Sequence, residues 1–145
     1  MNKAFKLGVT ALVAISFGGV TATTADAATW HKGLPKFVRN KKFRTKFENK
    51  YKEYTWARGT KRTFSIKHTQ ADIDVAKNVK YQKKGKTYLI RGTYPDRATH
   101  KLFAKYYRVR KISNKKIKAG FGKRGKLMTM TKFKHFPRIK GQIWN

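Results

Sequence analysis

Alternating hydrophobic and polar positions run through much of the chain, and the pattern is clearest in residues 79–94. Val79 and Tyr81 share one face of the first run. Tyr88 and Ile90 share one face of the return run, and a glycine lies between the two runs. Alternation with a period of two is typical of half-buried strands, and a glycine between two such runs favours a turn. The segment therefore predicts a β-hairpin with a cationic tip.

An isolated hairpin is marginally stable in water, so the flanking sequence is expected to supply further strands. The same alternation recurs on both sides of the hairpin, with hydrophobic faces that predict one shared core. The large side chains expected in this core are Phe43, Tyr54, Trp56, Phe64, Tyr88 and Ile90. In the long run 102–112, Lys105 interrupts the hydrophobic face. This interruption predicts a β-bulge near Tyr106 and Tyr107.

The alternation stops between Thr69 and Asn78. Thr69 and Asp72 have the spacing of a capping box, with Asp in place of Glu, and Asp74 follows in what would be the first helical turn. This spacing predicts one short helical turn near residues 70–78.

The strand pattern predicts an all-β protein with about eight strands in meander order and short connections. The simplest arrangement is a single small antiparallel up-and-down barrel, because closing the sheet removes exposed strand edges. A two-sheet sandwich is the alternative. The chain has no cysteine, so the fold is expected to be stabilised by packing rather than by disulfides.

The first 27 residues have the order of an export signal: a basic start, an apolar run over 7–20, and small residues ending in Ala25-Asp26-Ala27. We therefore predict a signal peptide over 1–27 and a secreted, extracellular product. Gly33 and Pro35 break the pattern in residues 28–40, which predicts an extended N-terminal arm. Residues 41–145 are expected to form a single β domain.

A resemblance can be stated from two segments, Thr29 to Lys36 (TWHKGLPK) and Tyr88 to Gly92 (YLIRG). Together with the basic strands, these segments resemble a group of small secreted, strongly basic proteins of lactic-acid bacteria with no assigned activity. The chain also resembles lipocalin-like barrels, although Asn40 to Phe43 lack the Gly and Trp typical of their first strand. The resemblance implies a secreted β-barrel and identifies no catalytic residues.

Positive charge dominates the composition, with 37 Lys and Arg against 6 Asp and Glu and a formal net charge of +31. No acidic residue follows Asp96, whereas residues 97–145 hold 16 Lys and Arg. Cations without internal counter-charges repel one another, which favours an external polyanion as partner. For an exported protein the expected partners are anionic cell-wall polymers such as teichoic acid, anionic glycans or DNA, with an anionic membrane surface also considered. The protein is then expected to be held non-covalently on the cell wall.

The predicted polyanion-binding residues belong to the acid-free segment, where they follow one strand end and two turns. They are Arg108, Arg110, Lys111, Lys115, Lys116, Lys118, Lys123, Arg124 and Lys126. Two alternatives to polyanion binding stay open. One is a lipocalin-like carrier of a small apolar ligand in the barrel interior. The other is a cationic membrane-active antimicrobial protein.

Candidate catalytic and metal-binding groups are sparse. Asp72 and Asp74 are the only carboxylates close in sequence after the signal segment, and helix capping accounts for them. The histidines show no i, i+4 pair and have no cysteine partners. Ser65 and Ser113 lack the context of a nucleophile elbow. We therefore predict no enzyme activity, no catalytic residues, no metal and no cofactor.

Overall fold

The computed structural model describes residues 29–48, 50 and 53–137, so the predicted signal peptide lies outside the described residues. The described part is all-β and contains no helix. Its strands are β1 (His31–Lys32), β2 (Lys41–Arg44), β3 (Thr55–Gly59), β4 (Phe64–His68), β5 (Lys77–Lys84), β6 (Thr87–Pro95), β7 (Leu102–Lys111), β8 (Lys116–Phe121) and β9 (Met128–Phe133).

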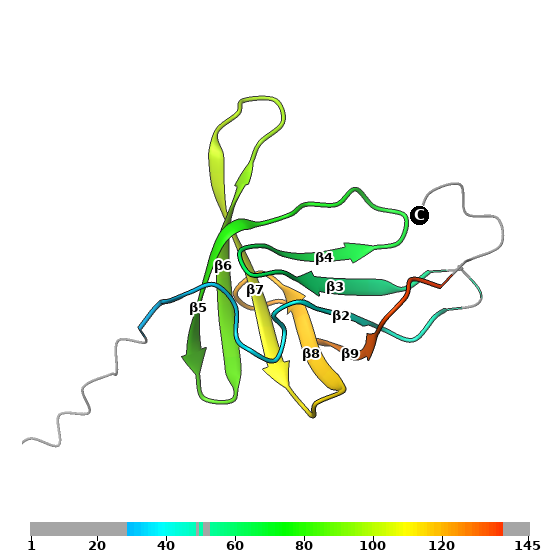
Figure 1. The fold of residues 1–145 in the computed structure, drawn as a ribbon. Coiled ribbons are helices and arrows are strands. Elements are labelled where there is room, and N and C mark those ends of the chain that lie inside the picture. Colours follow the sequence, from blue (N-terminus) through cyan, green and yellow to red (C-terminus); the bar gives the residue numbers. More distant parts are fainter. Residues whose placement is uncertain (1–28, 49, 51–52, 138–145) are drawn as a thin grey trace, which may run out of the picture.

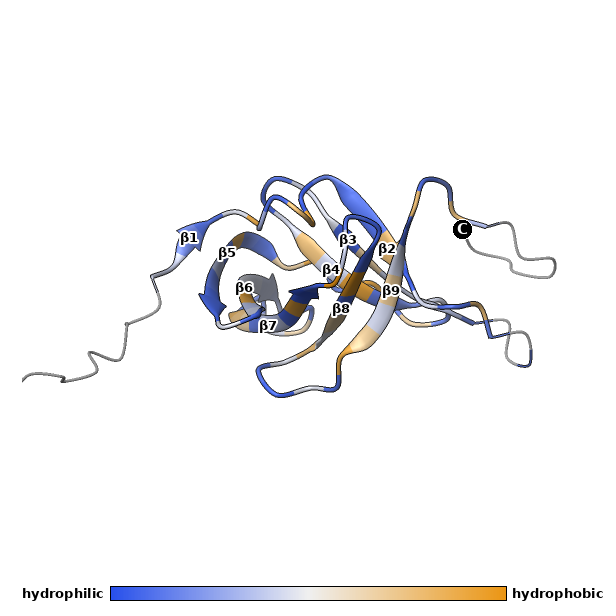
Figure 2. Ribbon diagram, turned by 90° about the horizontal axis from the view of Figure 1, so that it is seen from below, coloured by the Kyte–Doolittle hydropathy of each residue, from blue (hydrophilic) through white to orange (hydrophobic). Residues whose placement is uncertain are grey.

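The described strands form one antiparallel sheet in the order β1-β5-β6-β7-β8-β9-β2-β3-β4 (Figure 1, with β1 labelled in Figure 2). Strands β5 to β9 are consecutive neighbours, and so are β2 to β4. The pairing of β9 with β2 joins these two meanders into a single sheet. The all-β, antiparallel prediction is therefore confirmed, and the sandwich alternative is wrong because the strands form one sheet rather than two.

The predicted hairpin is confirmed as β5 and β6. Tyr81 lies opposite Ile90, and Lys84 lies opposite Thr87 across a turn of two residues. The first turn residue, Gly85, has a φ of +57°, in the left-handed region that glycine adopts most readily.

The sheet curls strongly, so that β4 returns to the segment that precedes β5 (Figure 2). Phe64 and Ala76 exchange two backbone hydrogen bonds, each 3.0 Å between nitrogen and oxygen. This isolated bridge links the two ends of the eight-strand series from β5 to β4, while β1 lies against β5 nearer the hairpin tip.

The core lies on the inner face of the curled sheet. Ile90, Tyr107 and Val109 supply its centre from β6 and β7, and they are fully buried. The other members of the cluster are Leu34, Val38, Phe43, Ala57, Phe64, Ile66, Ala76, Val79, Ile117, Ala119 and Met130. Burying side chains of this size is the main favourable term for a fold without disulfides.

The segment predicted as an extended N-terminal arm contributes to this core. Leu34 and Val38 are fully buried, and His31–Lys32 pairs with β5. The amide of Val38 donates to the carbonyl of Pro35, which makes a turn that directs both side chains inward. Residues 31–38 therefore pack as part of the β domain.

The predicted phase of β3 is wrong. Ala57 lies opposite Phe43 on β2 and opposite Ile66 on β4, so the inner face of β3 carries Ala57 rather than Trp56. Small residues suit this face because Leu34 fills the interior: a Cβ on Gly59 would lie 2.8 Å from its Cδ1.

Trp56, expected in the core, therefore lies on the outer face. It is 9% exposed because the C-terminal segment covers it, with the Phe136 ring 5.2 Å away between centroids. Tyr54, also expected in the core, lies two residues away in the same phase; it is buried, at 6% exposed, but lies outside the core cluster. Tyr88 is only half-buried, and its ring meets Phe37 at 5.1 Å.

The bulge predicted near Tyr106 and Tyr107 is absent, because β7 pairs with β6 in continuous register. Lys105 keeps its place in the alternation and reaches Asp74. The irregularity lies instead in β5, between Lys77 and Lys80, where two residues face one on β6.

The helical turn predicted near residues 70–78 is wrong. Residues 69–71 form a turn, residues 72–75 have no regular structure, and Ala76 joins the bridge to Phe64. Instead of capping a helix, the Thr69 hydroxyl donates to the Tyr54 carbonyl and accepts from the Tyr54 amide. Tertiary pairing thus replaces the local capping pattern.

Candidate anion-binding site

Three segments that are distant in sequence meet at the bulge in β5. The amide of Gly33 donates to the carbonyl of Val79 at 2.8 Å, and the amide of Val79 donates to the carbonyl of Arg62 at 3.2 Å. Both bonds use the backbone of one bulge residue, while its side chain is buried in the core. The N-terminal segment, the β3–β4 turn and β5 are thereby fixed against one another.

The strand register aligns cations on the face opposite the core, here called the outer face. Lys32 on β1 lies opposite Lys80 on β5, and Lys80 lies opposite Arg91 on β6. Arg91 is next to the fully buried Ile90, so it points away from the core because successive side chains alternate between faces. The pairings thus place three positive charges in a row across three strands.

A cleft of about 510 Å³ lies at this row, and we call it the bulge cleft. It is lined by Lys32, Gly33, Arg62, Asn78, Val79, Lys80, Arg91, Gly92 and Thr93. Four of these residues are cationic and none is acidic. Within the part of the chain that the structure describes, none of the four cations forms an ion pair. The bulge cleft therefore concentrates uncompensated positive charge.

One donor in the bulge cleft has no acceptor. The Nε of Arg91 is buried and makes no hydrogen bond with any described residue. A buried N–H without a partner is unfavourable, by about 1–3 kcal/mol. Arg91 therefore keeps one buried, unpaired donor among the residues that line the bulge cleft.

Aromatic rings contact two of the three cations in this row. The Nζ of Lys80 lies 5.5 Å from the centroid of Trp30, and the Cζ of Arg91 lies 6.0 Å from the centroid of Tyr106. Lys123 also approaches Tyr106, at 4.4 Å. Cation–π contacts of this kind hold long cationic side chains in place while leaving their charges near the surface.

The structure divides the nine residues predicted from the acid-free segment into two groups. Consecutive hairpin turns lie at opposite ends of the strand they share, so the β7–β8 and β8–β9 turns are separated by the length of β8. Near the first turn lie Arg110, Lys111, Lys115, Lys116 and Lys118; near the second lie Arg108, Lys123, Arg124 and Lys126.

Contacts within each group differ. Arg110 and Lys118 are direct cross-strand partners in the first group. In the second, Arg108 donates to the carbonyl of Gly125 at 3.2 Å, so part of its donor capacity is used within the protein. The expectation of one cluster around adjacent turns is therefore wrong, and only Lys123 reaches the row beside the bulge cleft, through Tyr106.

Sequence reasoning missed the bulge cleft, although it placed Lys80 and Arg91 on the polar face of the correct hairpin. Lys32 lies in the segment predicted as an extended N-terminal arm, and no sequence prediction concerns Arg62. Their approach depends on backbone hydrogen bonds to Val79, which no local pattern encodes. The register of the predicted hairpin, which places Lys80 opposite Arg91, is the one feature of the sequence that could have indicated this site.

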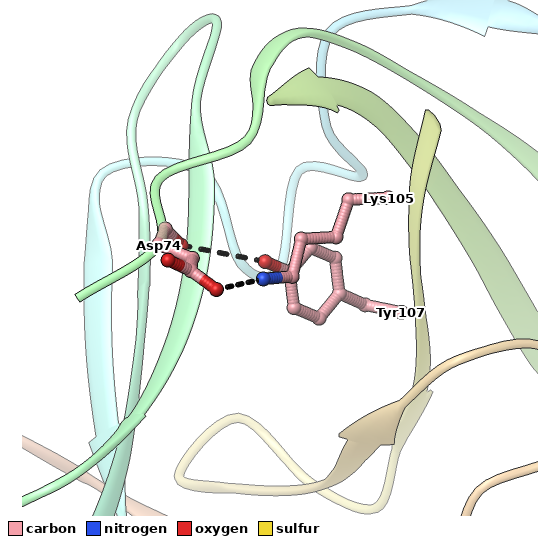
Figure 3. Close-up of polar contacts among 3 residues, drawn as sticks. All are labelled: Asp74, Lys105 and Tyr107. Carbon is pink, nitrogen blue, oxygen red and sulfur yellow. Dashed lines mark hydrogen bonds and ion pairs between the residues drawn. The ribbon is translucent and has the colours of Figure 1, made fainter. Parts of the chain in front are cut away.

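The two aspartates considered as a carboxylate pair are each engaged by a different cation. Asp72 pairs with Arg97 at 3.5 Å on an exposed surface. Asp74 pairs with Lys105, and Figure 3 shows Lys105 and Tyr107, both on β7, directed toward it. The Tyr107 hydroxyl donates to the Asp74 carbonyl at 3.5 Å. These contacts tie the 72–75 segment to β7.

The hydrogen bond from Lys105 shifts the pKa of its partner. This bond to the carboxylate holds the pKa of Asp74 below its ordinary value. Burial raises the pKa of the Tyr107 hydroxyl, so this group is a neutral donor in the core.

His31 and His68 make structural contacts with neighbouring side chains. His68 shares a hydrogen bond between its Nδ1 and the Thr55 hydroxyl, and the His31 ring lies 5.3 Å from the Tyr81 ring. Among the described residues no three His, Cys, Asp or Glu side chains gather as a metal site would require. Likewise, the described ranges include no helix with the length and apolar character needed to span a membrane.

Comparisons of the chain with protein-family models, with curated proteins and with solved structures found no match.

Proposed function

We propose that the protein binds anionic polymers through the basic outer face of its sheet. The observation that carries the proposal is the bulge cleft, where Lys32, Arg62, Lys80 and Arg91 meet without an acidic residue. Like charges on directly opposed strand positions are unfavourable, as for Lys80 and Arg91. A polyanion lying along the row would neutralise this repulsion and release its own counter-ions.

The proposal includes a cellular setting and a closed architecture. The protein is exported and retained on the cell surface by charge, with teichoic acid, anionic glycans or DNA as its partners. Strands β2 to β9 form an up-and-down barrel that closes between β4 and β5. Support for closure comes from the Phe64–Ala76 bridge and from the Val79–Arg62 hydrogen bond, which lie along the same junction.

Packing gives less support to carriage of an apolar ligand. Core side chains contact one another across the interior: the Phe64 and Tyr107 rings meet edge to face at 5.1 Å between centroids. Phe43, Ile90 and Met130 are also fully buried. Barrels of this strand number are commonly filled by their own side chains.

A membrane surface is a second candidate partner, favoured by the β6–β7 connection. This hairpin end projects beyond the rest of the sheet (Figure 1). Leu102 is 69% exposed and Phe103 is 53% exposed, with Lys101 and Arg97 close by in sequence. Apolar side chains beside cations suit the interface of an anionic bilayer.

The decisive experiment is a titration of the purified protein against duplex DNA, teichoic acid and anionic vesicles at several salt concentrations. Binding by counter-ion release weakens linearly with the logarithm of salt concentration, by about 0.9 per neutralised DNA phosphate. We expect such slopes with DNA and teichoic acid. Binding that does not respond to salt, or no binding to either polymer, would contradict the proposal. Tight binding to vesicles alone, lost in Leu102→Ser with Phe103→Ser, would establish the membrane candidate instead.

A further inference from the structure

The charge and size of the bulge cleft suit a particular kind of anion. Four cations line a space of about 510 Å³, which is within the range of small-molecule sites, about 300–1,000 Å³. A carboxylate carries a single charge, whereas a phosphate monoester carries about −1.5 to −2 near neutral pH. Neutralising four cations therefore favours a group with several charges over isolated carboxylates.

The hydrogen-bond donors of the bulge cleft also favour phosphate. Arg62 and Arg91 each present a planar guanidinium, whose N–H groups match the oxygens of phosphate. Lys32 and Lys80 add point charges without a fixed direction. The Nε of Arg91 has no acceptor within the described structure but is itself buried, so contact with a ligand falls to the terminal N–H groups of this guanidinium.

The backbone that carries the cations of the bulge cleft is held in place by hydrogen bonds and by core packing. The backbone of Val79 forms hydrogen bonds with Gly33 and Arg62, and the side chain of Val79 is buried in the core. Gly92 packs against the bulge so closely that a Cβ there would lie 2.7 Å from the Cβ of Ala76. A frame fixed before binding lowers the cost of ordering the site around a ligand.

We infer that the bulge cleft is a discrete site for adjacent phosphate groups, such as those of a pyrophosphate or a phosphorylated polymer. This inference rests on the proposed function and narrows it, because it assigns phosphate recognition to Lys32, Arg62, Lys80 and Arg91. The remaining outer-face cations then contribute long-range attraction without selecting among anions.

Inorganic pyrophosphate is the probe, with malonate as a dicarboxylate control at matched ionic strength of about 0.15 M. Calorimetric titration should give saturable one-to-one binding of pyrophosphate, with malonate at least about tenfold weaker. Arg91→Gln and Lys80→Gln should each weaken pyrophosphate binding by about tenfold or more. The matched charge losses Arg110→Gln and Lys118→Gln, which lie on the β7–β8 pair, should change it by less than about twofold.

A measurement on the unaltered protein tests the site even if the variants do not fold. The amide resonances of Gly33, Asn78 and Gly92, which line the bulge cleft, should shift with pyrophosphate, while those of Ile112 and Ser113, in the β7–β8 turn, should not. Trp30 fluorescence should change in the same titration, because its ring lies beside Lys80.

Three results would overturn the inference: no saturation by pyrophosphate, malonate binding as tight as pyrophosphate, or equal losses in the cleft variants and the β7–β8 variants. Parallel titrations with DNA separate this failure from failure of the proposed function. Salt-dependent DNA binding without pyrophosphate binding would disprove the phosphate site but leave the proposed function standing. Absence of binding to pyrophosphate, DNA and teichoic acid alike would contradict the proposed function as well.

Discussion

Lys80 on β5 and Arg91 on β6 lie directly opposite each other, so two positive charges occupy neighbouring positions on one face of the sheet. Opposed like charges destabilise a strand pair by a fraction of a kcal/mol to about 1 kcal/mol. This pair therefore lowers the stability of the free protein while it provides a binding surface for anions.

Removing one of these charges should stabilise the protein in the absence of ligand. We expect Lys80→Gln to raise the free energy of unfolding by about 0.2–1 kcal/mol in urea denaturation at low salt. The gain should shrink as salt is added, because salt screens the repulsion. Lys84→Gln is the control: it lies opposite Thr87, so its effect should be smaller and less dependent on salt. Lower stability of Lys80→Gln at low salt would contradict the prediction.

The different burial of two aromatic residues predicts different losses of stability when each is replaced by alanine. Phe64 is 1% exposed within the core, and Phe64→Ala should cost about 3–5 kcal/mol of unfolding free energy. Tyr88 is half-buried beside Phe37, so Tyr88→Ala should cost clearly less. Lys84→Ala, at the exposed hairpin tip, should stay within about 0.5 kcal/mol. Urea denaturation of the three variants decides the matter, and equal costs at Phe64 and Tyr88 would show that the assigned burial is incorrect.

Gly92 is required by close packing against the bulge. A Cβ at this position would lie 2.7 Å from the Cβ of Ala76 and 2.9 Å from the carbonyl oxygen of Lys77. Gly92→Ala should therefore force the backbones apart and reduce stability by about 1–3 kcal/mol. Thermal unfolding measures the loss, with Thr87→Ala on the same strand as a control expected within about 0.5 kcal/mol. An unchanged melting temperature for Gly92→Ala would disprove the close contact.

The Asp74–Lys105 pair predicts a pH dependence. The folded-state pKa of Asp74 is lowered, so the carboxylate stabilises the fold above its ordinary pKa of about 4, and this contribution is lost as pH falls through the lower folded-state value. Asp74→Asn should cost up to about 1 kcal/mol near neutral pH, because water screens this partly exposed pair.

The corresponding measurement is urea denaturation of Asp74→Asn and the unaltered protein near neutral pH and at about pH 3. The difference between them should shrink at the lower pH. Asp72→Asn is the control, since its pair with Arg97 is highly exposed and should contribute less. A difference that stays constant or grows toward acid would mean that the ion pair does not stabilise the fold.

Retention on the cell surface by charge predicts release by salt. Cells that produce the protein should hold part of it on the wall, and a wash at about 1 M salt should release that fraction because the Debye length falls to about 3 Å. Immunodetection in the wash and in the washed cells provides the measurement. A bound pool that stays with the cells through the wash would disprove electrostatic retention.

Much of the fold follows from local sequence pattern. The β5–β6 hairpin, the antiparallel class and the burial of Phe43, Phe64 and Ile90 follow from period-two alternation and from turn residues. The phase of β3 could not be predicted in this way. Trp56 is the more hydrophobic choice for the core, yet Ala57 faces inward because Leu34 and Phe43 already fill that space.

The candidate site shows a similar division. The composition alone predicts that the partner is anionic. The meeting of Lys32 and Arg62 at one place depends on tertiary hydrogen bonds to Val79, which the sequence pattern does not reveal. Lys105 is a further example, because a charged residue within a hydrophobic alternation indicated a bulge. Its actual partner, Asp74, is distant in sequence and cannot be inferred from the strand alone.

The pairing of β2 with β9 has a consequence for how the chain folds. Lys42 pairs with Phe133, so one edge of β2 is completed only by β9, the last described strand. Contacts of such long sequence separation require a large loss of chain entropy before they form, which slows folding. Until β9 has been synthesised, β2 exposes an unpaired edge that can recruit other chains. A truncation before Met128 would therefore leave an aggregation-prone product, whereas a truncation after the last strand would keep the sheet complete.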